Sequence, residues 1–137
     1  MADITKDIRA ALETKLNNIS GLPDVAWENW NFDPKANESY VTPRLLPTRR
    51  EPSHTGPNPQ IYYRGLFVVD CYVPSGGQVG PSEADTLAET IINEFEATTD
   101  ITTAKCNIHI RNAEREQGRT KGSHYMVPVL ISWQTYQ

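Results

Sequence analysis

The sequence predicts an α+β fold, in which a mostly antiparallel or mixed β-sheet of about five strands is flanked by two helices. Two observations support this prediction. Apolar residues recur every three or four positions over residues 3–19 and 82–96, which is the period of an amphipathic helix. Apolar residues recur at every second position within residues 61–73, 105–111 and 124–133, as they do in strands, and in residues 105–111 polar residues fill the positions between them. The expected order of elements is α-β-β-β-α-β-β.

Each predicted helix has one apolar stripe and a recognisable boundary. Gly21 and Pro23 end the first helix, because glycine accepts left-handed geometry and proline cannot continue a helix. Ser82 is the expected cap of the second helix, which runs to about Glu96. The two stripes consist of Ile4, Ile8, Leu12, Leu16 and Ile19, and of Ala84, Leu87, Ala88, Ile91, Ile92 and Phe95. Each helix is therefore expected to cover a sheet.

The strands differ in the strength of their signal. Residues 25–29 are a short and weak strand, and residues 40–46 contain Pro43, which would break a central ladder and places this strand at an edge. Residues 61–73 are the strongest strand and are expected at the centre of the sheet. Residues 124–133 close the chain with a further β-rich run.

Asp70 is the one acidic residue inside the strongest strand. Its neighbours Phe67, Val69, Cys71 and Val73 share the opposite face. An unpaired buried carboxylate would cost several kcal/mol. We therefore expect Asp70 either to face solvent or to pair with Arg64 or Arg111.

Two polar segments interrupt this plan. Residues 47–60 hold four prolines and no large apolar side chain, so we expect a mobile Pro-rich loop. Residues 112–122 gather charged side chains around two glycines, which predicts the charged tip of a hairpin. Both segments are candidate contact surfaces. A length of 137 residues otherwise fits a single domain over residues 1–137.

Composition excludes several classes of function. The chain has 13 Lys and Arg residues against 17 Asp and Glu residues, so no global positive charge attracts nucleic acid. The apolar run at Val127–Ile131 is far shorter than the roughly 20 residues that span a bilayer, so we expect no membrane contact. The N-terminus lacks the basic start and apolar stretch of a signal peptide, which favours the cytoplasm. Cys71 and Cys106 are expected to be buried free thiols.

No catalytic template is complete, and we expect no enzyme, no metal and no cofactor. Cys106 and His109 have a C-x-x-H spacing, but in a strand these positions point to opposite faces. Residues 76–82 connect a strand to a helix without the lysine of a phosphate-binding loop.

Four segments, taken in order and spacing, carry a family resemblance. They are residues 7–13 (DIRAALE), 21–29 (GLPDVAWEN), 63–74 (YRGLFVVDCYVP) and 125–133 (YMVPVLISW). The chain resembles the tail terminators of bacteriophages with long, non-contractile tails, the family that includes the lambda-type tail terminator. The resemblance extends over nearly the full length.

The resemblance implies a structural protein that forms a six-membered ring on the finished tail tube. Such a ring stops tube polymerisation and offers its other face for head-tail joining. The implied partners are further copies of the chain, as a homohexamer, the major tail tube protein and a head-completion or connector protein. DNA would contact the protein only while it passes through the channel of the ring. The implied location is the virion tail, after assembly in the host cytoplasm.

Candidate contact residues follow from the two polar segments. The charged hairpin offers a subunit or tube interface made of Glu114, Arg115, Glu116, Arg119 and Lys121. The Pro-rich segment and its approach offer a channel or assembly loop that carries Arg44, Arg49 and Arg50.

Two competing functions remain open at this point. Trp27, Trp30 and Phe32, with Arg44 nearby, would form an exposed aromatic patch in a small module that binds a peptide or single-stranded nucleic acid. A hydrolase built on Cys106, His109 and Asp70 is disfavoured, because strand geometry scatters these three side chains.

Overall fold

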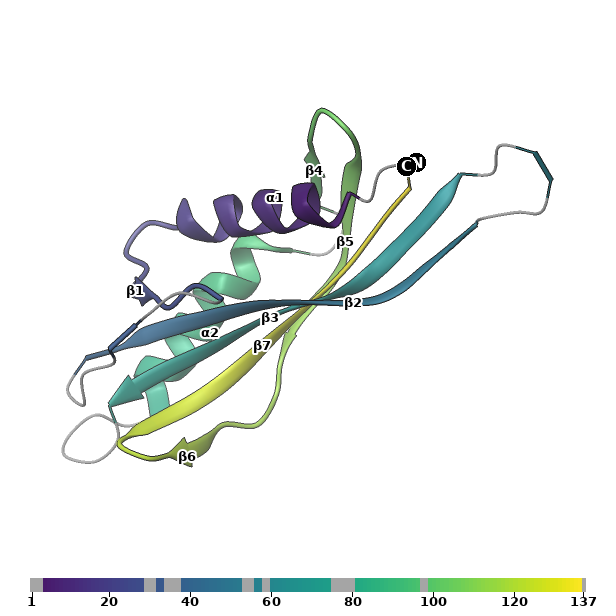
Figure 1. Ribbon diagram of the computed structural model, residues 1–137. Coiled ribbons are helices and arrows are strands. Elements are labelled where there is room, and N and C mark those ends of the chain that lie inside the picture. Colours follow the sequence, from purple (N-terminus) through teal and green to yellow (C-terminus); the bar gives the residue numbers. More distant parts are fainter. Residues whose placement is uncertain are drawn as a thin grey trace.

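A computed structural model describes residues 4–28, 32–33, 38–52, 56–57, 60–74, 81–96 and 99–136 of the chain. Two helices lie against one face of a strongly twisted sheet, which we call the inner face (Figure 1). The opposite face is called the outer face. The elements are α1 (Thr5–Asn17), β1 (Asp24–Val25), β2 (Tyr40–Pro52), β3 (Ile61–Pro74), α2 (Pro81–Glu94), β4 (Asp100–Thr102), β5 (Asn107–Arg115), β6 (Arg119–Lys121) and β7 (His124–Tyr136).

The α+β class is confirmed, whereas the expected count of about five strands is too low. Seven strands within the described residues form one sheet in the order β1-β2-β3-β7-β5-β4, and β6 pairs with β7. Only β1 and β2 run parallel. The short strands β1, β4 and β6 have two or three residues each, too few to show an alternating pattern in the sequence.

The core lies between the helices and the inner face, as the periodicity predicts. Ile8, Leu12 and Leu16 of α1 are fully buried. Ala84, Ala88 and Ile91 of α2 are also fully buried, and α2 contacts β7, β3 and β5. The sheet contributes the side chains of Val41, Leu45, Phe67, Val69, Cys71, Val73, Ile108, Ile110, Val127, Val129, Ile131 and Trp133. The central position expected for β3 is confirmed, because it pairs with β2 on one side and β7 on the other.

Pro43 lies on an edge strand, as expected. Beyond the two residues of β1, the free side of β2 has no strand neighbour among the described residues. The backbone N–H of Leu45 points to this side and donates to Oε1 of Glu28 at 2.8 Å. By the two-residue period of a strand, Pro43 and Pro47 occupy the equivalent outward positions and have no N–H. The edge of β2 is thus poorly suited to adding a strand from another chain.

The predicted loop at residues 47–60 is wrong for its first part. Pro47–Pro52 continues β2 and pairs with β3 from Ile61 to Gly65, with a bulge between Pro47 and Arg49. The prolines are tolerated because they lie on an edge strand. Figure 1 shows this end of β2 and β3 as a ribbon that extends away from the helices. Residues 53–55 and 58–59 lie outside the described residues, and the mobility of the tip stays a prediction.

The predicted hairpin tip at residues 112–122 is also mostly strand. Asn112–Arg115 belongs to β5 and Arg119–Lys121 forms β6, both paired with β7. The turn is confined to Gly122 and Ser123, and Gly122 adopts a φ of 62°, which favours glycine. Charged residues do not prevent strand pairing here, because their side chains are exposed to solvent.

Neither described helix is both long enough and apolar enough to cross a membrane.

Candidate functional site

The outer face of the sheet carries a groove. Its lining comes from β2, β3, β6, β7 and the connection between β5 and β6, and its volume is about 630 Å³. We call it the outer-face groove, and its residues are Arg44, Leu46, Leu66, Val68, Asp70, Glu116, Gln117, Arg119, Lys121, Met126, Pro128 and Leu130. Both helices pack on the inner face, so neither covers this groove.

The middle of the groove is apolar. Val68 is 3% exposed and Met126 is 2% exposed, although neither belongs to the core that the helices cover. Leu46 is 39% exposed and is one of two large hydrophobic side chains that stay exposed among the described residues. An apolar strip bordered by charged side chains is typical of a protein contact surface.

Asp70 lies in the groove and is only 8% exposed. Nε of Arg44 lies 3.7 Å from its Oδ2, whereas its buried Oδ1 makes no hydrogen bond within the described structure. Burial raises the pKa of Asp70 above its usual 3.8, although Arg44, Lys121 and Arg119 act in the opposite direction. The groove therefore contains a hydrogen-bond acceptor with unused capacity.

The predicted partners of Asp70, Arg64 and Arg111, are wrong. In the register of β2 and β3, Thr42 lies opposite Asp70 and Arg44 lies opposite Val68, so Arg44 is a diagonal neighbour of Asp70. Arg64 lies six residues away along the same strand, about 20 Å at the usual rise. The sequence alone did not reveal the ion pair between Arg44 and Asp70, because the two residues come close only when β2 pairs with β3.

Residues from both predicted contact sets meet in the groove. Arg44 comes from the proposed channel set, and Glu116, Arg119 and Lys121 come from the proposed interface set. They meet because β2 and β6 lie on opposite sides of the pair formed by β3 and β7. Lys121 also donates to the hydroxyl of Tyr72 at 3.5 Å.

The other members of the two sets lie elsewhere. Arg115 forms an ion pair with Asp85 of α2 and so points toward the inner side. Glu114 lies opposite Leu130 in the register of β5 and β7, next to the groove but outside its lining. Arg49 pairs with Glu51 at 3.0 Å on the extended ribbon. Arg50 donates to the hydroxyl of Tyr63 at 3.1 Å.

The apolar lining of the groove was not identified from the sequence. The strands that carry this lining were predicted, but only their helix-covered side was expected to pack. The apolar side chains on the other side are Leu66, Val68, Met126 and Leu130. The available signal was that β3 is apolar on both faces. Strands with two apolar faces are buried on both sides or await a partner.

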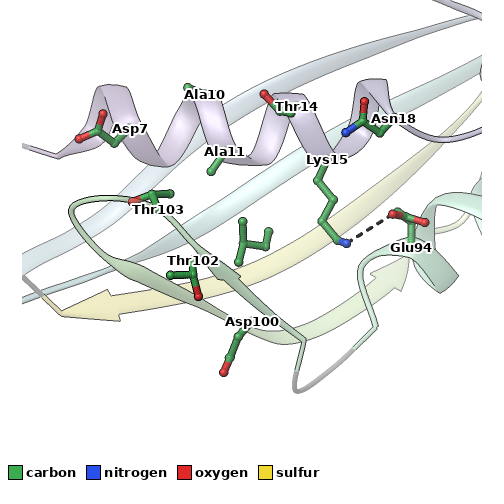
Figure 2. A pocket seen from close by; sticks show the side chains of 11 residues that line it. Asp7, Ala10, Ala11, Thr14, Lys15, Asn18, Glu94, Asp100, Thr102 and Thr103 are labelled. Carbon is green, nitrogen blue, oxygen red and sulfur yellow. Dashed lines mark hydrogen bonds and ion pairs between the residues drawn. The ribbon is translucent and has the colours of Figure 1, made fainter.

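A second depression lies between α1 and β4, with a volume of about 590 Å³ (Figure 2). Its charged residues are neutralised within the chain. Nζ of Lys15 lies 3.4 Å from Oε1 of Glu94, and Nζ of Lys105 lies 3.5 Å from Oδ2 of Asp7. Threonine and alanine side chains make up much of the remaining lining. Asp100 also lines the depression and lies 2.8 Å from Nδ1 of His109, so each charged side chain of the lining has a partner among the described residues.

The residues considered for catalysis do not come together. Nδ1 of His109 lies 2.8 Å from Oδ1 of Asp100, while the thiol of Cys106 contacts Thr103. The strand of Asp70 is separated from β5 by β7. Burial raises the pKa of the Cys71 thiol to about 12, which makes it a poor nucleophile. Among the described residues, no group of three His, Cys, Asp or Glu side chains is placed to hold a metal ion.

The predicted aromatic patch is only partly described. Trp27 packs against the core, and the ring of Phe32 lies 5.1 Å from that of Tyr40. Trp30 lies outside the described residues. Packing of Trp27 against the core leaves less of its ring for stacking on a base or a peptide.

The fold is similar to solved structures, and the sequence matches a protein family. One solved structure, which carries no functional name, aligns with a TM-score of 0.75 and 24% identity over 97% of this chain and 96% of its own. A chain in the virion of a native gene transfer agent (GTA) particle aligns with a TM-score of 0.61 and 12% identity, over 95% of each chain. No curated protein matches the sequence. Residues 7–133 match the phage tail terminator protein family, so the chain belongs to that family and is a structural component of a phage tail.

Proposed function

We propose that the chain ends the phage tail as a ring of identical copies. The ring caps the tail tube, stops its polymerisation and provides the surface on which head and tail join. The family match over residues 7–133 carries this proposal. The monomer also supports it, because a closed ring of head-to-tail contacts needs two different surfaces on each copy. The outer face of the sheet and the helix-covered side are two such surfaces.

The proposed partners follow from this role. They are further copies of the chain in a six-membered ring, the major tail tube protein on one side and a head-completion or connector protein on the other. DNA passes through the channel without stable binding. The protein acts by shape and contact, transforms no molecule, and is assembled onto the tail in the host cytoplasm.

The site residues divide between two roles in this proposal. Glu116, Arg119 and Lys121 in the groove, with Glu114 beside it, contact a neighbouring copy or the tube. Arg49 and Arg50 extend on the β2–β3 ribbon, where they line the channel. Arg44 belongs with the groove, since it pairs with Asp70.

Electron microscopy of tails made with and without the protein tests the function. We expect tails of uniform length that carry a terminal cap and join heads when the protein is present. Without it, we expect long, irregular tails that stay separate from heads. Tails of normal length that join heads in its absence would overturn the proposal.

A further inference from the structure

Neither described helix covers the outer-face groove, and the chemistry of the groove indicates what binds there. Its middle is apolar. The acidic side chains Asp70 and Glu116 also line the groove, and Asp70 pairs with Arg44. Arg119 and Lys121 at its sides have no ion pair among the described residues. A matching surface must bring negative charge to these cations and a hydrogen-bond donor to the free Oδ1 of Asp70.

Helix α2 presents a surface with these properties on another side of the chain. Residues 81–94 include four acidic residues and no Lys or Arg, and two of the acids, Asp85 and Glu94, are already paired within the chain. Ala84, Ala88 and Ile91 fix the buried side of α2 against the sheet, so its acidic side faces solvent. Glu83 and Glu89 are exposed there, and neither has an ion pair with a cation of the described chain.

The exposed side of α2 also carries donors. Ser82 and Asn93 are exposed, and each has a group that donates a hydrogen bond. A donor placed against Asp70 would satisfy its Oδ1, which has no hydrogen-bond partner among the described residues. Charge and hydrogen bonding thus both match the groove to the same helix.

We propose that the groove of one copy receives the exposed acidic side of α2 from the neighbouring copy. This inference rests on the proposed ring, and it names the two surfaces that make the ring contact. The contact is head to tail, because the groove lies on the outer face of the sheet whereas α2 packs on its inner face. The blocked edge of β2 fits this arrangement, since it directs assembly to side-chain contacts rather than strand addition.

Two charge-reversed variants test the contact. The groove variant carries Arg119→Glu and Lys121→Glu, and the helix variant carries Glu83→Lys and Glu89→Lys. All four positions are exposed, so we expect the variants to fold, which circular dichroism checks. Lys105→Glu is the matched control, because this exposed cation pairs with Asp7 of α1, outside both surfaces.

The readout is the number of head-joined tails of normal length when each variant is supplied to a phage that lacks the gene. We expect either variant alone to lower this number about tenfold or more, because like charges then face each other. Supplying both variants together should restore it to within about threefold of the unchanged protein, since the reversed groove matches the reversed helix in alternating copies. The control variant should behave like the unchanged protein.

Three outcomes overturn the inference. The first is that each variant alone works normally, and the second is that the mixture is no better than either variant. The third is that only the groove variant fails, which would assign the groove to another partner such as the tube protein or passing DNA. In all three, the unchanged protein still restores tails, so the proposed function stands. Normal tails without any copy of the protein would instead overturn the proposed function.

Discussion

The inner and outer faces of the central strands are built from alternate residues of the same chain segments, yet they differ in what covers them. On β3, Val69 faces the helix-covered core, whereas Val68 faces the groove. On β7, Ile131 is fully buried and its neighbour Leu130 is partly exposed. The inner face therefore provides the stability of the single chain. On the outer face Val68 is already buried, but Leu130 and Leu46 keep apolar surface that a partner can bury.

The largest expected effect on stability comes from a matched pair of substitutions, one on each face of β7. Ile131→Ala should lower the free energy of unfolding by about 2–5 kcal/mol, because it leaves a cavity in a closed core. Leu130→Ala should cost only about 1 kcal/mol, because the groove is open to water. Chemical denaturation measures both values. Equal losses would show that the two faces do not differ as described.

A second change tests how closely the inner face is packed. Gly65→Ala would place a methyl group 2.8 Å from Cζ2 of Trp133 and against the backbone carbonyl of Leu46. We expect a loss of about 1–3 kcal/mol, since the backbone oxygen has little freedom to move. Ser132→Ala, at the partner position of Leu66 on the outer face, is the control and should be nearly neutral. A neutral Gly65→Ala would contradict the close packing, and thermal unfolding measures both variants.

A third change, at Glu28, tests the contact on the free edge of β2. Burial by itself raises the pKa of Glu28, but hydrogen bonds from the N–H of Leu45 and from Arg9 outweigh it and hold the pKa below 4.5. The carboxylate is therefore expected to stabilise the fold above the pKa of the unfolded chain, and this stabilisation is lost as pH falls through the folded pKa.

Glu28→Gln should accordingly cost about 1 kcal/mol at pH 7. The difference from the unchanged protein should shrink in acid, which denaturation at several pH values measures. A difference that stays constant with pH would contradict the role of the charged form. Exposed Glu96→Gln is the control, because it has no ion pair within the described structure.

The smallest expected effect is a gain, rather than a loss, in the free energy of unfolding. Because the folded pKa of Asp70 is raised, the charged form costs stability above that pKa, and the cost disappears as pH falls toward the usual 3.8. Asp70→Asn should therefore raise the free energy of unfolding slightly at pH 7, with no gain in acid. The same variant should weaken assembly, because Asn offers a poorer acceptor to the neighbouring copy. Lower stability at pH 7 would instead make Asp70 a structural ion-pair partner of Arg44.

Much of the fold was predictable from local pattern. The stripes of α1 and α2, the central place of β3 and the edge position of Pro43 were all predicted, and the structure confirms each. The errors lie where pattern is short or ambiguous. Pro47–Pro52 was predicted as loop because residues 47–60 hold four prolines and no large apolar side chain, but an edge strand accepts prolines and does not need two buried faces.

The candidate site was predictable only in part. Arg44, Glu116, Arg119 and Lys121 were chosen from charge, but the sequence assigned them to two separate surfaces. The ion pair between Arg44 and Asp70 depends on the register of β2 against β3, which the sequence does not specify residue by residue. Arg115 was placed with the interface, and α2 instead supplies its partner, Asp85.

The sequence by itself determined the period of each long element, the residues that form the helix-covered core, and the resemblance to a phage tail terminator, because these depend on neighbours along the chain. Only the tertiary structure decided which charges meet, that Glu28 occupies the free N–H on the edge of β2, and which outer-face apolar side chains stay partly exposed. The physical reason is that these properties depend on strand order and register, and both are settled when distant segments pair and pack.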